Sequence, residues 1–515
     1  MRPYLNRRKA FKKFDFLKIE FFKNLSSFPA EMPSPLIWGS KINLEVKALL
    51  FSSIPFLYYF LPAVLLCYAI APRKLKNGVL FAFSLIFYAW GEPVYVFLMA
   101  ASITLAWGFA LLMEKAKTQK AKKAFMIISV IISFAFLCYF KYADFFISNF
   151  NAATGLSVPL LRIALPVGIS FYTFQIASYT IDVYRGEAKA KRNIIDFGTY
   201  VVLFPQLIAG PIVRYVDIAD MLENRTHTLE KTAYGIHRFC LGLGKKVLLA
   251  NAFGELCSIF RASEEQTVLF YWIYAASFML QIYFDFSGYS DMAIGLGRIL
   301  GFTFLENFDF PYISKSITEF WRRWHMSLGS WFRDYVYIPL GGNRVSKGRW
   351  LFNILVVWFL TGFWHGADWQ FMAWGIFYGA LLVVEKLWLK KWLDKAPAIL
   401  CHVYVLFLTA IGFVIFNSVN IAGAFADLKG MFGLSGLPLF GAQTFYYLKS
   451  YALMFIAGSL LATPVVKTVL KKANSTAIGG KVIAFARPLF YAAVLIIVTG
   501  YLVDGSFNPF LYFRF

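Results

Sequence analysis

Long apolar runs, separated by short polar or basic connections, cover most of the chain from residue 50 onward. They lie at about 50–71, 78–90, 94–113, 124–149, 162–182, 196–212, 233–252, 267–285, 289–303, 350–364, 368–384, 401–418, 447–463 and 486–503. Because the apolar residues are continuous and do not alternate with polar ones, the pattern predicts membrane helices and not the strands of an outer-membrane barrel.

Several of these runs are too short to cross a hydrocarbon core of ~30 Å as straight helices. Broken segments at membrane depth are tolerated where they pack within protein or line a cavity. We therefore predict an all-α, polytopic transmembrane bundle with about 11–13 crossings, together with re-entrant and interfacial helices.

Composition narrows the class of protein. Hydrophobic residues make up 59% of the chain and charged residues 15%, whereas soluble domains average roughly 45–50% and roughly 25%. A soluble enzyme, a disordered chain and a disulfide scaffold are thereby excluded. The five scattered cysteines form no CxxC pair, so neither a zinc site nor a redox pair is indicated.

The chain carries a formal net charge of +23. Basic residues cluster in the connections at 73–76, 115–123 and 185–192, which predicts that these loops face the cytoplasm. No nucleic-acid-binding motif accompanies the charge, so we expect no nucleic-acid partner.

Two domains are predicted. Residues 1–47 hold ten Lys and Arg against four Asp and Glu; they form a basic N-terminal extension that is interfacial, disordered or upstream of the native start. Residues 48–515 form the transmembrane domain, with a motif-bearing core at 160–385.

Polar residues within apolar runs are the informative ones, because they are costly in lipid. The prolines and glycine of the segment 205–214 predict a re-entrant turn and not a straight span. The segment 283–291 places two carboxylates around a Ser-Gly break. Five candidate residues are selected. Gln175 comes from the segment 166–182, and the other four come from 283–291: Asp285, Ser287, Tyr289 and Asp291.

The segment 321–335 combines aromatic, basic and histidine residues. Positions 321, 324, 325, 328, 332 and 335 share one helical face, which predicts an amphipathic helix at the membrane surface. His325 lies on the aromatic face, whereas Arg322 and Arg323 lie on others. The alternative for His325 is a packing residue held by a hydrogen bond.

A second histidine, His365, lies near the turn of a predicted helical hairpin at 350–384, which basic residues flank on both sides. The first arm spans roughly 22 Å, less than the ~30 Å of the hydrocarbon core. His365 is therefore expected within the membrane, where it is paired or faces a water-filled cavity. Burial keeps the imidazole neutral, the form that accepts a proton. The alternative is a hydrogen bond between helices.

Common catalytic and ligand motifs are absent. The chain has no GxSxG, Walker A or HExxH pattern. Gly295, Gly297 and Gly301 weakly resemble a dinucleotide loop, but close helix packing explains them better. Two histidines forty residues apart do not indicate a metal site.

Six longer motifs carry a family resemblance: PVGISFYTFQ, FPQLIAGPIVR, QIYFDFSGYSDMAIG, NFDFPYISKSITEFWRRWHMSLGSWFRDYVYIPLGGNR, TGFWHGADWQF and the final NPFLYFRF. Through them the chain, from about residue 48 to 515, resembles the membrane-bound O-acyltransferase (MBOAT) family and its bacterial alginate O-acetylation branch.

The resemblance implies a helical fold with a funnel or tunnel and acyl transfer to a hydroxyl of an exported or cell-envelope polysaccharide. It places the active-site pair at His325 and His365, with His365 the essential position. It implies acetyl-CoA as the donor, no tightly bound cofactor, an acetyltransferase-like extracytoplasmic partner protein and a place in the bacterial inner membrane, in contact with lipid.

Acyl transfer from a thioester needs a base and polarisation of the carbonyl. His365 suits the base, and His325 either donates to the oxyanion or holds the donor. Direct transfer and relay through an acylated protein both remain open, as do two other functions: transfer of D-alanyl or another acyl group, and a non-enzymatic polysaccharide export channel. The other candidates brace the funnel or bind polar groups of the ligand: Gln175, Asp285, Ser287, Tyr289, Asp291, Arg322, Arg323, Trp324, Asp334 and Trp364.

Overall fold

The computed structural model describes residues 49–505 together with residues 508 and 511. The chain divides into two units, 1–47 and 48–515, and the predicted basic extension at 1–47 lies outside the described residues. Every regular element that the structure describes is a helix, which confirms the all-α prediction.

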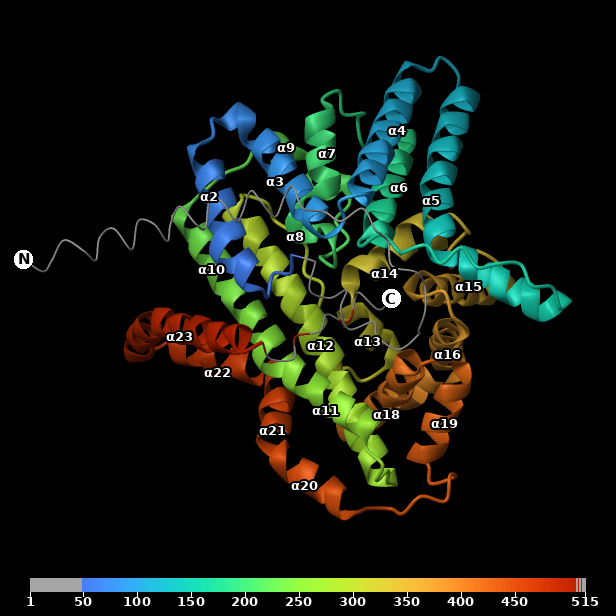
Figure 1. The fold of residues 1–515 in the computed structure, drawn as a ribbon, viewed down its shortest axis with the longest axis vertical. Coiled ribbons are helices and arrows are strands. Elements are labelled where there is room, and N and C mark those ends of the chain that lie inside the picture. The colour runs from blue at the N-terminus through green and yellow to red at the C-terminus, as the bar shows by residue number, and fades with distance from the viewer. Residues whose placement is uncertain (1–48, 506–507, 509–510, 512–515) are drawn as a thin grey trace, which may run out of the picture. The chain divides into compact units, whose positions relative to one another are not determined.

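The helices up to residue 223 pack as a group (Figure 1). They are α2 (Leu61–Ile70), α3 (Lys76–Gly91), α4 (Tyr95–Lys115), α5 (Gln119–Thr154), α6 (Ile169–Arg185), α7 (Ile194–Val202), α8 (Phe204–Leu207) and α9 (Tyr215–Glu223).

The remaining helices include the long α12. They are α10 (Leu229–Gly244), α11 (Asn251–Ala262), α12 (Val268–Ile299), α13 (Ile317–Arg323), α14 (Met326–Phe332), α15 (Lys347–His365), α16 (Trp369–Val384), α17 (Lys390–Leu393), α18 (Ala398–Asn417), α19 (Ile421–Met431), α20 (Ala442–Ser450), α21 (Ala452–Leu461), α22 (Val465–Asn474) and α23 (Ala477–Val503).

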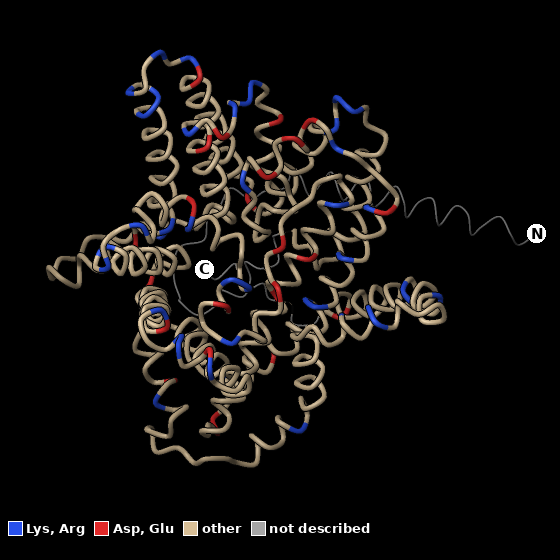
Figure 2. Tube along the Cα trace, turned by 180° about the vertical axis from the view of Figure 1, so that it is seen from behind, with Lys and Arg blue, Asp and Glu red and all other residues tan. Residues whose placement is uncertain are grey.

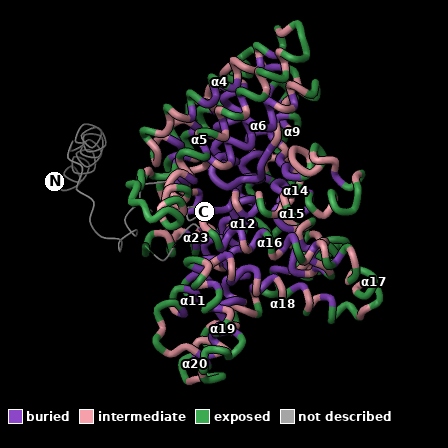
Figure 3. Tube along the Cα trace, turned by 90° about the vertical axis from the view of Figure 1, so that its right-hand side faces the viewer, coloured by how far each residue is buried: buried purple, intermediate pink, exposed green. Residues whose placement is uncertain are grey.

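Helix α12 forms much of the buried interior, as Figure 3 shows. The predicted break at Ser287-Gly288 is wrong, because α12 continues through it for 32 residues. Gly288 instead permits close contact with α10, since a Cβ atom there would lie 2.8 Å from the carbonyl oxygen of Gly242. A Cβ on Gly295 would likewise lie 2.6 Å from the Gly235 carbonyl oxygen. The close helix packing predicted for the glycine-rich segment is thus confirmed at Gly295.

The predicted count of 11–13 crossings exceeds what helix length and apolarity support. Among the described residues, six helices are long and apolar enough to span a membrane, or seven if α21 and α22, bent by 63°, form one span. Two predicted runs, 267–285 and 289–303, are one helix, α12. The run at 196–212 is broken, because α7 ends at Val202 and only the short α8 follows. That break confirms the non-straight path predicted for 205–214.

The three basic connections lie at one end of this helical unit. In Figure 2 the Lys and Arg residues of the α2–α3, α4–α5 and α6–α7 connections gather at the top. A shared end is what a common side of the membrane requires, so the arrangement supports a common side for these three loops; that this side is the cytoplasm stays a prediction.

The contact between α10 and α12 is tested by Gly295→Ala. The added Cβ meets backbone atoms of α10, which no side-chain rotation relieves, so we expect a loss of about 1–3 kcal/mol in stability. Gly108→Ala in α4 is the control, because a Cβ there meets no atom within 4 Å. Thermal unfolding in detergent compares the two variants, and equal midpoints would contradict the account of this interface.

Candidate active site

His365 is the last residue of α15, where the chain turns toward α16. This confirms the predicted hairpin with a histidine at its turn. The imidazole is 7% exposed. It packs edge-on against Trp374 of α16 and Phe416 of α18, with ring centroids 5.2 and 5.3 Å away. Its Nδ1 atom is buried without a hydrogen-bond partner, so one ring nitrogen is free for a ligand.

Two neighbouring residues of α5 hold the carboxyl end of α15. The Lys141 Nζ donates to the carbonyl oxygens of Trp364 at 2.6 Å and His365 at 3.1 Å. The Tyr142 hydroxyl donates to the carbonyl oxygen of Phe363 at 2.7 Å. The last carbonyls of a helix have no partner within it, and a cation is favoured there by the helix dipole. Lys141 and Tyr142 thereby fix the position of His365.

The sequence analysis did not select Lys141 or Tyr142. A usable signal was present, because Lys141 interrupts the long apolar run of α5, and an ionisable residue within a membrane span is a functional candidate by default. Its partners could not be inferred, since they are backbone atoms more than two hundred residues away.

His365 is shared by two cavities. One, of about 70 Å³, is lined by Lys141, Ser170, Trp364 and His365, with the connection that precedes α6. The other, of about 20 Å³, is lined mainly by aromatic and aliphatic side chains. The imidazole therefore forms a wall between the two spaces. These two cavities do not show the expected funnel or tunnel, which stays a prediction.

His325 lies at a break between two short helices. Helix α13 ends at Arg323, and His325 takes a left-handed conformation (φ 45°) before α14 begins. The predicted continuous amphipathic helix over 321–335 is therefore wrong. Trp324 and His325 are 5% and 2% exposed, so the segment is buried in the protein and does not lie on a surface.

The hydrogen bonds around His325 settle which ring nitrogen carries its proton. Asn307 Oδ1 accepts from the backbone N–H and the hydroxyl of Ser327, so this atom is the amide oxygen. The His325 Nδ1, 3.2 Å away, must then donate to it. In the neutral ring, Nε2 consequently carries a lone pair, and it is buried without a partner.

Trp364 lies between the two histidines. Its ring centroid is 5.0 Å from that of His365 and 6.3 Å from that of His325. His325 itself lines neither cavity. The structure thus brings both predicted histidines into one aromatic cluster and places only His365 at open space.

Two other predicted residues line the second cavity, Asp285 and Trp324. The Asp285 carboxylate forms an ion pair of 2.6 Å with Lys246, and both side chains are at most 3% exposed. A buried pair of this kind is costly to break, because one charge would remain uncompensated.

The other predicted residues lie away from the cavities. Asp291 pairs with Arg238 and Lys245 between α12 and α10. The rest divide between the interior and the surface: Ser287, Tyr289 and Gln175 are buried on α12 and α6, Arg322 is exposed, and Arg323 pairs with Asp309 and Glu319.

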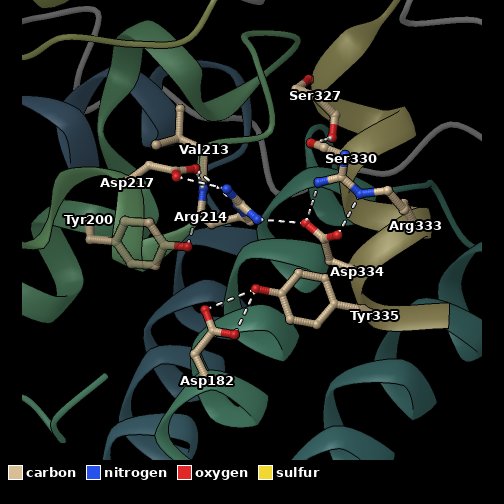
Figure 4. A network of polar contacts seen from close by, with 10 residues as sticks. All are labelled: Asp182, Tyr200, Val213, Arg214, Asp217, Ser327, Ser330, Arg333, Asp334 and Tyr335. Carbon is tan, nitrogen blue, oxygen red and sulfur yellow. Dashed lines mark hydrogen bonds and ion pairs between the residues drawn. The ribbon is translucent and has the colours of Figure 1, made fainter. Parts of the chain in front are cut away.

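Asp334 belongs to a polar network that ties the segment after α14 to two other elements (Figure 4). Its carboxylate pairs with Arg214, which precedes α9, at 2.8 Å, and with the neighbouring Arg333 at 2.7 Å. A hydrogen bond to Asp217 raises the pKa of Arg214 above its ordinary value, so the guanidinium of Arg214 stays positively charged. The next residue, Tyr335, donates to Asp182 of α6. Asp334 therefore braces the His325 segment from one side.

Comparison with known proteins identifies the family. Residues 183–398 match the model of MBOAT, the membrane-bound O-acyltransferase family. The chain is 39% identical over 503 residues to the probable alginate O-acetylase AlgI of Azotobacter vinelandii, covering 91% of this chain and 100% of that protein. The chain belongs to the membrane-bound O-acyltransferase family. As a member of this family it is a multi-pass membrane protein and an O-acyltransferase.

Two relatives of lower identity have other activities in their names. A peptidoglycan O-acetyltransferase of Helicobacter pylori is 33% identical over 432 residues, 77% of this chain and 82% of that protein. A teichoic acid D-alanyltransferase of Bacillus subtilis is 30% identical over 271 residues, 49% of this chain and 68% of that protein. The family resemblance predicted from the motifs is confirmed.

The position of His365 is tested by Lys141→Met, which keeps the length of the side chain and removes its hydrogen bonds to α15. We expect acyl transfer to fall by up to about 100-fold, because a small displacement of a reacting group is enough for such a loss. Lys123→Met, an exposed change on the same helix, should leave the rate unchanged. Transfer is measured at equal protein abundance, and equal rates for both variants would contradict the positioning role.

Proposed function

We propose that this O-acyltransferase moves an acetyl group from cytoplasmic acetyl-CoA toward hydroxyls of an exported or cell-envelope polysaccharide, and that it does so in the bacterial inner membrane. The names of its relatives support this proposal, because alginate O-acetylases align with most of the chain and a peptidoglycan O-acetyltransferase with 77% of it.

The observation that carries the proposal is the position of His365 between two cavities. A donor and an acceptor that approach from different directions can meet only at a group that both spaces share. His365 is that group, and its buried Nδ1 has no partner within the protein.

The reaction joins an alcohol and a thioester. His365 takes the proton from the incoming hydroxyl, whose oxygen bonds to the carbonyl carbon, and the carbon–sulfur bond then breaks. The sulfur leaves with the proton that His365 carried, so the products are an ester and free CoA thiol. A positioned base of this kind contributes about 10²–10⁴-fold to the rate.

His325 has a different role in this proposal. Because its Nδ1 donates to Asn307, the neutral ring offers an acceptor at Nε2. An acceptor suits an amide N–H of the donor's pantetheine arm and does not suit an oxyanion. Of the two roles predicted from the sequence, we therefore propose that His325 holds the donor. His325 lines neither cavity, so this role requires the aromatic cluster around it to open when the donor binds.

The acceptor hydroxyl belongs either to the polysaccharide itself or to an extracytoplasmic, acetyltransferase-like partner protein that relays the acyl group. Transfer of D-alanyl to a wall polymer has weaker support, because the D-alanyltransferase of B. subtilis aligns with only 49% of this chain. A polysaccharide export channel has no support in the described residues, since the two cavities are small and separate.

The proposal is tested by His365→Ala in cells that depend on this protein for polymer acetylation. Acetyl content of the envelope polysaccharide, determined by mass spectrometry, should fall by about 10²-fold or more, the share of a general base. His237→Ala is the control, because His237 contacts Tyr491 and lines neither cavity.

Both variants must be present in membranes at the wild-type amount. Unchanged acetylation in His365→Ala would reject the assignment of His365. If the polymer modified by the wild-type protein shows the mass increment of alanyl and not that of acetyl, the function is D-alanyl transfer and not acetyl transfer.

A further inference from the structure

One residue beyond α23, Leu511, lines the second cavity. Leu511 is 4% exposed and lines this cavity together with His365. Its backbone N–H donates to Asp285 Oδ2 at 3.1 Å. Three residues earlier, the Asn508 side-chain amide donates to the carbonyl oxygen of Ser52 at 2.8 Å and accepts from Asn251 at 3.1 Å. Leu511 is therefore held in place by the protein.

Asp285 links Leu511 to the rest of the site. One of its carboxylate oxygens pairs with Lys246 and the other accepts from Leu511. The charge of Asp285 is compensated by Lys246, and both of its oxygens are engaged. Asp285 thus acts as an anchor for Leu511, although the sequence analysis selected it as a funnel residue.

The second cavity is small and largely apolar, so of the possible acyl groups it favours the shortest. Its volume, about 20 Å³, exceeds only slightly the roughly 10–15 Å³ that one water needs. Its walls are largely apolar, formed by Ile282, Phe286, Trp324, Phe413, Phe416 and Leu511.

One wall residue supplies a free donor. Trp374, only 2% exposed, has its indole N–H buried without a partner and lines the same cavity beside His365. A buried donor of this kind costs free energy unless a ligand atom pairs with it. A carbonyl oxygen would satisfy the indole N–H while a methyl group filled the apolar remainder.

We propose that the second cavity holds the acyl group of the donor and that Leu511 limits this group to two carbons. The inference rests on the proposed acyl transfer and adds which length of acyl group the protein accepts. An aminoacyl group fits this space poorly, because the one carboxylate in its wall, Asp285, is already used by Lys246 and the Leu511 N–H.

Leu511→Ala tests the inference, with Leu511→Ile as a control that keeps the volume. Membranes that contain each protein and the acceptor polymer receive acetyl-, propionyl- or butyryl-CoA, and the acyl content of the polymer is measured by mass spectrometry. In Leu511→Ala the butyryl-to-acetyl ratio should rise at least about tenfold, because one methylene in an apolar pocket changes discrimination by about 10–200-fold. Leu511→Ile should keep the wild-type preference for acetyl.

A second variant enlarges the same cavity from a helix. Phe413→Leu should raise the same ratio, whereas Val405→Ala, a buried change on α18 away from the cavity, should not. An unchanged ratio in both Leu511→Ala and Phe413→Leu would overturn the inference even if their overall rates fell. Absence of any acyl transfer by the wild-type protein would instead reject the proposed function, and the inference with it.

Discussion

The carbonyl groups at the end of α15 impose the constraint on which the site depends. Trp364 and His365 are buried in the protein, so protein groups and not bulk water must satisfy these carbonyls. Lys141 and Tyr142 supply the hydrogen bonds from α5. Because His365 is the residue at which this helix ends, the interactions that satisfy the backbone also set the position of the imidazole. The hydrogen bonds that complete the backbone of α15 are thus the same ones that fix the proposed catalytic residue.

Helix α12 contributes the second half of the site. Its glycines allow α10 to approach closely, and this contact places Lys246, in the helical continuation of α10, against Asp285 of α12. The buried ion pair in turn holds Leu511 at the second cavity. Close packing of small residues is the usual way in which membrane helices approach each other. Here it also carries a charged pair into the interior, where the pair organises a cavity wall.

Local pattern was enough to predict part of this structure. The hairpin around His365 follows from apolar runs with basic flanks, and the broken path at 205–214 follows from its prolines. The pattern failed where distant residues decide the outcome. Judged from the local sequence alone, Gly288 indicated a break in the helix. In the structure it lies inside the continuous α12, where it contacts Gly242 of α10. The helical periodicity around His325 was misleading, because Asn307 and the left-handed turn fix that segment.

Lys141 and Leu511 illustrate the same limit for the site. Each meets its partner across more than two hundred residues, and one side of the contact is a backbone atom that has no sequence signature. The motifs were enough to select the two histidines. Only the tertiary structure shows that Lys141 positions His365 and that Leu511 lines the second cavity beside it.

The most direct test of the central claim is a cryo-EM structure of the full chain with a thioether analogue of acetyl-CoA that cannot be cleaved. The account predicts the acetyl-like group in the cavity bounded by Trp374 and Leu511. Its reactive carbon should lie where a hydroxyl within about 3 Å of the His365 ring can attack it. An acyl group bound elsewhere, with the second cavity empty and His365 remote from the sulfur, would contradict the account.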